Sequence, residues 1–167
     1  MAGALIVLVE LGAPDFAWFD QLRWRHYPPD RNRVPAHLTL FRALPPSAED
    51  EVRRSLARAA SRAPPEARTS GVMDLGEGVA LRVDSLALDR IRAELAGEFH
   101  GLLSSQDSGP WTAHVTIQNK AEPTAVRALL REMREGFEPR PIRVRGLQLV
   151  RYAEGGWEPI AAYRFRG

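Results

Sequence analysis

The chain has 167 residues, of which 44% are hydrophobic and 26% charged, and its formal net charge is +2. This composition is that of a folded globular protein, and it excludes a disordered chain. There is no cysteine, which excludes disulfides, thiolate metal sites and a cysteine nucleophile. The net charge is too small to indicate a nucleic-acid partner. However, 22 of the 23 basic residues are arginine, the better bidentate partner for phosphate. Genomic codon bias is the alternative explanation, since alanine and proline are abundant too, so the charge alone decides nothing.

The run over residues 4–11 is apolar and rich in β-branched side chains, which predicts a buried strand. It is much shorter than the roughly 20 residues of a transmembrane helix. No basic segment of the kind found in signal peptides precedes it. We therefore expect a cytoplasmic protein with no membrane segment.

Apolar spacing predicts the later elements, and proline and glycine mark their boundaries. Ser47 is expected to cap the second helix, and Ser85 or Asp84 the third. The predicted elements are a helix over 15–26, a strand over 36–43, a helix over 47–62, two strands around 76–78, a helix over 85–103, a loop over 104–110, a strand over 111–120, a helix over 123–135, and strands over 142–152 and 158–165.

The order of these elements repeats along the chain. In each half, a strand that contains a histidine is followed by a proline, a helix and a pair of strands, and the proline comes nine residues after the histidine. We therefore predict an α+β fold, with residues 1–167 forming a single bilobal, duplicated domain. We expect two largely antiparallel sheets, each flanked by helices, with a central cleft between the lobes. A doubly wound parallel sheet is disfavoured because helices do not alternate with single strands.

Two tetrapeptides share the pattern His-apolar-Thr-apolar: HLTL over 37–40 and HVTI over 114–117. In a strand, residues two apart point to the same face, so each histidine shares a face with its threonine while the apolar residues face the core. His37, Thr39, His114 and Thr116 are therefore the candidate catalytic residues. The two copies occupy matching places in the repeated order, which strengthens the prediction.

Two imidazoles and two hydroxyls suit acid–base chemistry on a tetrahedral phosphate. An imidazole titrates near neutral pH, so one ring can accept a proton while the other donates one. The threonine hydroxyls can donate hydrogen bonds to oxygens on which negative charge develops. In-line displacement at phosphorus needs the acid and the base on opposite sides, and a two-lobed cleft provides that arrangement.

Two other interpretations of the motifs are open. Each histidine and threonine could be half-buried and satisfied by the backbone. The histidines could also bind a metal, but the motifs lack the carboxylates or third imidazole typical of such sites, so we expect no metal and no cofactor.

Strand alternation extends the candidate site. Phe41 continues the His37 face and could stack on a base, and Lys120 continues the His114 face and could attract phosphate, so both are candidate substrate-binding residues. Core packing for Phe41 and a solvated position for Lys120 are the alternatives. Arg42 and Arg151 are further candidates by position alone, and His26 and His100 receive no role because neither is followed by such a threonine.

With these motifs, the sequence resembles the two-histidine (2H) phosphoesterases, and in particular the 2′-5′ RNA ligase and cyclic phosphodiesterase group. The VPA and WTA segments before the motifs and the closing pair GLQLVRY and GWEPIAAYRF support the resemblance, which covers essentially the whole chain. Ala36 and Ala113 stand where many members have proline, and Trp157 stands where a tyrosine is often found.

The resemblance implies a bilobal fold with the motifs on adjacent central strands. It also implies a metal-independent enzyme that hydrolyses the 2′,3′-cyclic phosphate ends of RNA or nucleotides to 2′-phosphates, with reversible 2′-5′ RNA ligase activity. His37 and His114 correspond to the catalytic histidines of the family, and Thr39 and Thr116 to its phosphate-binding hydroxyls. We expect a monomer.

Two alternatives to this activity stay open. The first is a non-catalytic RNA-binding module of the same fold, although binding alone would not need both histidines. The second is a phosphodiesterase that acts on another small cyclic phosphodiester.

Overall fold

The computed structural model describes residues 3–167, and its elements follow the predicted order. The first half contains β1 (Leu5–Leu11), α1 (Ala13–His26), β2 (Leu38–Leu44), the 3-10 helix η1 (Pro46–Ala48), α2 (Glu49–Ala59), β3 (Glu66–Asp74) and β4 (Val79–Asp84). The second half contains α3 (Leu86–Glu98), α4 (Ser105–Ser108), β5 (His114–Gln118), α5 (Pro123–Glu135), β6 (Pro141–Ala153) and β7 (Gly156–Arg164).

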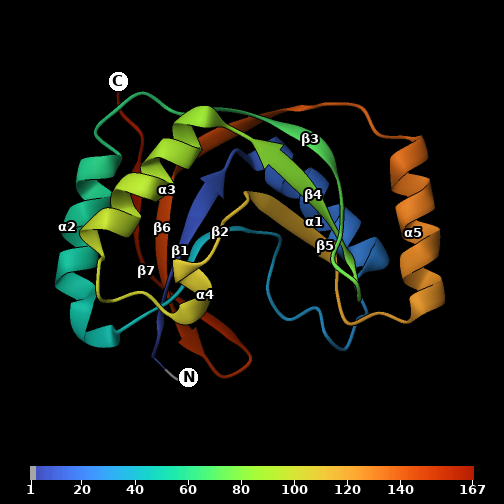
Figure 1. Cartoon of the computed structure of the whole chain (residues 1–167), viewed down its shortest axis with the longest axis horizontal. Coiled ribbons are helices and arrows are strands. Elements are labelled where there is room, and N and C mark those ends of the chain that lie inside the picture. The colour runs from blue at the N-terminus through green and yellow to red at the C-terminus, as the bar shows by residue number, and fades with distance from the viewer. Residues whose placement is uncertain (1–2) are drawn as a thin grey trace.

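The strands of residues 3–167 form one seven-stranded sheet in the order β2-β1-β6-β3-β4-β5, with β7 also paired to β6. All of the strand pairs are antiparallel, which confirms the predicted α+β class. Figure 1 shows α2 and α3 at one end of the sheet and α5 at the other.

The two groups of strands that we expected as separate sheets are joined through β6. The first three residues of this long strand pair with β3, and its later residues pair with β1 and β7. Because β6 belongs to both groups, the sheet is continuous. The duplicated, bilobal character of the domain stays a prediction.

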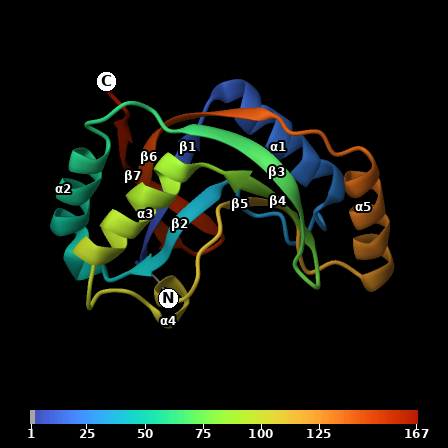
Figure 2. The ribbon, with the colours of Figure 1, turned by 45° about the horizontal axis from the view of Figure 1, so that its top comes forward.

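The resemblance implies that the motifs lie on adjacent central strands, but β2 and β5 stand at opposite ends of the pairing order. The two strands nevertheless contact each other. The sheet therefore curves until its two end strands lie side by side, as the turned view in Figure 2 shows. Sheets twist and coil because of backbone sterics, and here the curvature brings the two motif strands together.

The main hydrophobic core contains residues from both halves of the chain, among them Val7, Leu38, Ile91 and Leu147, each at most 3% exposed. A smaller cluster lies beneath α5 and contains Val79, Ile117 and Val126. The buried faces of β2 and β5 belong to these clusters, so the opposite faces of the two strands are left for the site.

Local signals predicted both ends of α5 correctly, but the helix predicted over 85–103 ends at Glu98 and the strand predicted over 111–120 covers only His114–Gln118. Ser85 caps α3, since its hydroxyl accepts a hydrogen bond from the Leu88 N–H at 3.1 Å. Ser47 does not cap the second helix, because it lies inside η1 and α2 begins only at Glu49. The predicted loop over 104–110 contains the one-turn helix α4.

Among the helices of residues 3–167, none combines the length and apolarity needed to cross a membrane.

Candidate active site

The two motifs occupy equivalent places on β2 and β5. His37 directly precedes β2, His114 is the first residue of β5, and each threonine follows two residues later. All four side chains are half-buried. The intervening apolar residues are at most 1% exposed, so the predicted alternation is confirmed within both motifs.

The two motifs lie next to each other. The indole Nε1 of Trp111, just before β5, donates a hydrogen bond to the Thr39 carbonyl oxygen at 3.0 Å. The charge of His114 also acts on the His37 ring. The structure therefore brings the two histidine–threonine pairs to one place.

Both imidazole rings are oriented by the same hydrogen bond. Nδ1 of His37 lies 2.8 Å from the Pro35 carbonyl oxygen, and Nδ1 of His114 lies 2.7 Å from that of Thr112. A carbonyl oxygen only accepts, so Nδ1 must carry the proton in both rings. In the neutral form Nε2 then has the lone pair, and it is the nitrogen available for proton transfer.

The surroundings of His37 favour its neutral form and attract anions. Burial, the largest cause, lowers the pKa of His37 to about 4, and the positive charges of Arg23, His114 and Arg42 contribute to the lowering, whereas the hydrogen bond to Pro35 opposes the shift. The three charged side chains that act on this ring are all basic. A phosphate placed among them would compensate their mutual repulsion.

Arg23 connects the first half of the chain to the second motif. It comes from α1, is 2% exposed, and donates from Nη1 to the Thr116 carbonyl oxygen at 3.0 Å and from Nε to Asn32 Oδ1 at 3.1 Å. Its guanidinium also lies over the Tyr27 ring, 4.1 Å from the centroid. Arg23 thus holds the backbone of β5 beside the site.

Arg92 makes the reciprocal connection from α3 to the first motif. Its Nε donates to the Leu40 carbonyl oxygen and its Nη2 to the Asp107 carbonyl oxygen, both at 2.8 Å. The Asp107 carboxylate in turn accepts hydrogen bonds from the backbone N–H groups of Arg42 and Ala43. β2 has a neighbouring strand on one edge only. On its backbone, the side chains of Arg92 and Asp107 make hydrogen bonds of the kind that a second neighbouring strand would make.

The sequence predictions missed both arginines, although a signal for each was present. Arg23 follows Phe19 by four residues and Arg92 follows Leu88 by four, so each shares a helix face with a fully buried apolar residue. An arginine on the apolar face of a predicted helix indicates a buried guanidinium with a structural partner.

A cavity of about 890 Å³ opens beside His37. The Trp157 ring meets the His37 ring edge-on, with their centroids 4.8 Å apart and an angle of 82° between the planes. Phe16, Arg33 and Arg145 also line this cavity. Most of the other lining residues are apolar, one is the acid Glu10, and His37 is the motif residue that lines the cavity. The volume suits a nucleotide-sized ligand.

The prediction that Phe41 stacks on a substrate base is wrong. A β-bulge interrupts the pairing of β2 with β1, where Leu8 pairs with Thr39 but Val7 pairs with Phe41. The extra residue reverses the alternation, so Phe41 turns into the core. It is 0% exposed and packs edge-on against Phe99, with the Arg92 guanidinium over its ring.

Lys120 lies beyond the end of β5, so strand alternation does not direct it towards the His114 face. It is exposed and has a left-handed backbone, with φ of 55°. Its contact with substrate stays a prediction.

Arg151, a candidate by position alone, and the two histidines without a predicted role lie at other places. Arg151 pairs with Glu49 on α2, His100 is exposed at the end of α3, and His26 Nε2 lies 3.6 Å from the Glu132 carboxylate on α5. Within residues 3–167, no group of three or more His, Cys, Asp or Glu side chains has the arrangement of a metal site.

A backbone hydrogen bond explains why alanine, and not the proline of many family members, stands at position 36. Its backbone N–H donates a hydrogen bond to Asp20 Oδ1 at 2.9 Å, which ties the segment before His37 to α1. A proline has no N–H and could not make this bond.

Comparison with known proteins identifies relatives of this fold. A family model described as the 2′-5′ RNA ligase superfamily matches residues 12–156, and a comparison with curated proteins found no match. Among solved structures, TT0787 of Thermus thermophilus has a TM-score of 0.72 at 20% identity, and the match covers 98% of each chain. E. coli LigT in complex with 3′-AMP has a TM-score of 0.68 at 16% identity, and the match covers 100% of each chain. These similarities show a shared fold, and the family match covers most of the sequence, so the chain belongs to the 2′-5′ RNA ligase superfamily.

Proposed function

We propose that this protein is a metal-independent phosphodiesterase that hydrolyses 2′,3′-cyclic phosphate ends of RNA or nucleotides to 2′-phosphates. The observation that carries the proposal is the equivalent hydrogen bond of the two rings. At the starts of two strands in contact, His37 and His114 each donate a hydrogen bond from Nδ1 to a carbonyl oxygen two residues upstream, which leaves Nε2 for proton transfer. Two such rings are what an acid–base pair requires.

The reaction needs one imidazole on each side of the phosphorus. The first ring accepts a proton from water through Nε2 as the water oxygen attacks phosphorus. The bond from phosphorus to O3′ breaks, and the second ring donates its proton to O3′, which leaves a 3′-hydroxyl and a 2′-phosphate. The hydroxyls of Thr39 and Thr116 donate to the non-bridging oxygens as charge builds on them. A 5′-hydroxyl that attacks in place of water would give a 2′-5′ phosphodiester bond, and that ligation is reversible.

The basic surroundings of His37 support a phosphate ligand. Arg23 and Arg42 act on its ring together with His114. The solved complex of E. coli LigT with 3′-AMP, a nucleotide, is consistent with the same class of ligand.

Alanine replacements of the two histidines test the proposal. His37→Ala and His114→Ala should each lower kcat for a 2′,3′-cyclic nucleotide by about 100-fold or more, the usual contribution of one general acid or base. His100→Ala is the matched control, because His100 is exposed and outside the motifs, and it should retain full activity. NMR of the product should show a 2′-phosphate.

Chelation separates this chemistry from a metal-dependent reaction. Activity should be unchanged in excess chelator, and loss that added metal restores would contradict the proposal. Binding of cyclic-phosphate RNA without any product over many hours would instead favour an RNA-binding module. Turnover confined to other cyclic phosphodiesters would keep the mechanism and change the substrate.

A further inference from the structure

A second hollow, along β6, shares a lining residue with the cavity beside His37. This second hollow, of about 1560 Å³, lies where the ends of β3, β6 and β7 meet the start of α3, and we call it the β6 groove. Arg145 lines both the His37 cavity and the β6 groove. The positive charge of Arg145 is therefore common to the two hollows.

Arginines dominate the charge of the β6 groove. Its basic side chains are Arg68, Arg90, Arg143, Arg145 and Arg164, and its acidic ones are Asp15, Glu66 and Asp84. Two of the three acids are already engaged, and the third, Glu66, lies opposite Arg143 in the pairing of β3 with β6. Asp15 binds Arg140 and the backbone N–H of Arg143, and Asp84 faces Arg82 at 3.5 Å. Arg164 faces Glu10 at 3.6 Å.

The guanidinium groups of Arg143 and Arg145 have no ion-pair partner among residues 3–167. The same holds for Arg33, which lines the His37 cavity. Arg33 and Arg145 line the His37 cavity and Arg143 lines the β6 groove, and none of the three is held in an ion pair with another described residue. We call these three residues the arginine strip.

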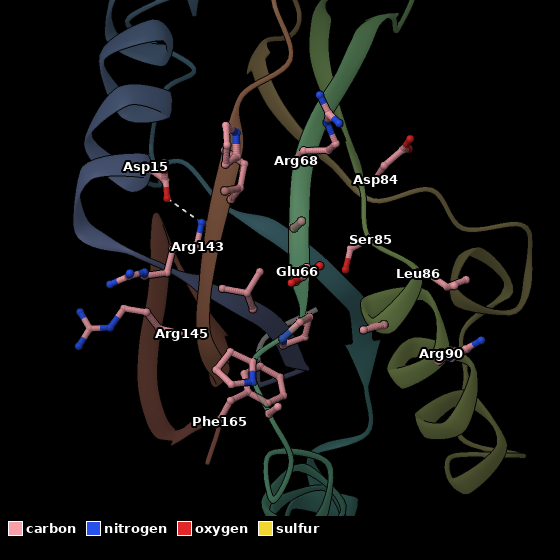
Figure 3. A pocket seen from close by; sticks show the side chains of 18 of the residues that line it. Asp15, Glu66, Arg68, Asp84, Ser85, Leu86, Arg90, Arg143, Arg145 and Phe165 are labelled. Carbon is pink, nitrogen blue, oxygen red and sulfur yellow. Dashed lines mark hydrogen bonds between the residues drawn. The ribbon is translucent and has the colours of Figure 1, made fainter. Parts of the chain in front are cut away.

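The geometry of the strip suits a chain of phosphates. Arg143 and Arg145 are two residues apart on β6 and extend to the same side of it, as Figure 3 shows. Such positions are about 7 Å apart in a strand, a step comparable to that between successive phosphates of an extended polynucleotide. The stem of Arg143 lies across Gly12, where an added Cβ would come within 3.0 Å of it, so close packing positions this side chain.

We propose that the arginine strip binds the backbone phosphates of a single-stranded polynucleotide whose 3′ end lies between His37 and His114. The substrate class is then an RNA end several nucleotides long, and a free nucleotide fills only the His37 cavity. This inference rests on the proposed function for the position of the 3′ end. The charge of the strip, its spacing and the place of Arg145 in both hollows support it.

Salt-dependent binding tests the proposal without requiring catalysis. The probe is a fluorescent single-stranded RNA of about six nucleotides that ends in a 2′-phosphate, and the readout is fluorescence anisotropy. Each phosphate contact on a single strand contributes about 0.7 to the slope of log K against log salt. Arg143→Gln should therefore reduce the slope by about 0.7, and the double variant Arg143→Gln/Arg145→Gln by about 1.4. At about 0.2 M salt the double variant should bind about tenfold more weakly.

Matched controls separate a specific effect from unfolding or loss of net charge. Arg54→Gln removes one charge from an exposed arginine of α2 outside both hollows, and it should leave the slope unchanged. Thermal unfolding of all variants shows whether they are folded. Arg54→Gln should also hydrolyse a 2′,3′-cyclic mononucleotide at the normal rate, because Arg54 lines neither hollow.

An unchanged slope in a folded double variant would overturn the strip as a polynucleotide site. An equal loss with Arg54→Gln would overturn it too, since only general charge would then matter. If no cyclic phosphate is hydrolysed while the slope still falls as expected, the proposed function fails and the strip stands. If hydrolysis persists with an unchanged slope, the reverse holds.

Discussion

At the scale of single residues, the surroundings of His37 set a measurable pH dependence. Burial, assisted by Arg23, His114 and Arg42, lowers its pKa to about 4, whereas a histidine in an unfolded chain titrates near 6.5. Between these values the unfolded chain binds more protons than the folded one, so stability falls as the pH drops from about 6.5 to 4. The loss attributable to this ring approaches about 3 kcal/mol at the lower limit.

We therefore predict that the His37 ring remains neutral in NMR titrations until the pH approaches 4. Inorganic phosphate should raise this pKa, because a nearby negative charge favours the imidazolium. By the same linkage, phosphate should bind more tightly as the pH falls. His37→Asn should remove part of the acid sensitivity of unfolding, with His100→Asn as the control. A His37 pKa near 6.5 that does not respond to phosphate would contradict the anion site.

At the scale of elements, the turn between β3 and β4 controls the position of β5. A Cβ added at Gly78 would lie 1.9 Å from the Gln118 carbonyl oxygen at the end of β5. Gly78→Ala should therefore displace β5, lower the free energy of unfolding by about 1–3 kcal/mol and reduce turnover, because His114 and Thr116 are on this strand. Urea unfolding and kinetics measure the two effects.

Gly71→Ala on β3 is the matched control for this prediction. An added Cβ there meets no atom within 4 Å, so the variant should retain its stability and its activity. If Gly78→Ala and Gly71→Ala had the same stability and the same turnover, the close approach of Gly78 to β5 would not be needed to position β5.

The elements that the sequence predicts well are those whose ends depend on local signals. Helix ends were predictable where a local signal was enough, as with the Ser85 cap of α3 and Pro123 at the start of α5. The faces of both motifs were predictable because alternation is also local. Phe41 was not, because the bulge that turns it inward arises from the pairing of β2 with the distant β1. The contact of β2 with β5 was inferred from the resemblance, since it depends on the curvature of the whole sheet.

At the scale of the whole molecule, the two halves of the chain depend on each other. The main core draws residues from both halves, β6 pairs with β1 and β3 of the first half, and the buried Arg23 and Arg92 each bind the backbone of the other half's motif strand. Separate unfolding of either half would expose the apolar face of the other. The site should therefore form only when the entire sheet does.

We accordingly predict a single cooperative unfolding transition. Leu147 is 0% exposed on β6 within the main core, so Leu147→Ala should lower the free energy of unfolding by about 2–5 kcal/mol. Because both halves share this core, amide exchange should accelerate in β2 and β5 alike. Leu86→Ala is the matched control, since Leu86 is 67% exposed on α3 and its truncation should change stability by less than about 0.5 kcal/mol. If Leu147→Ala loosened one motif strand and left the other protected, the halves would unfold independently, and a site built across them would have to form by docking of two stable lobes.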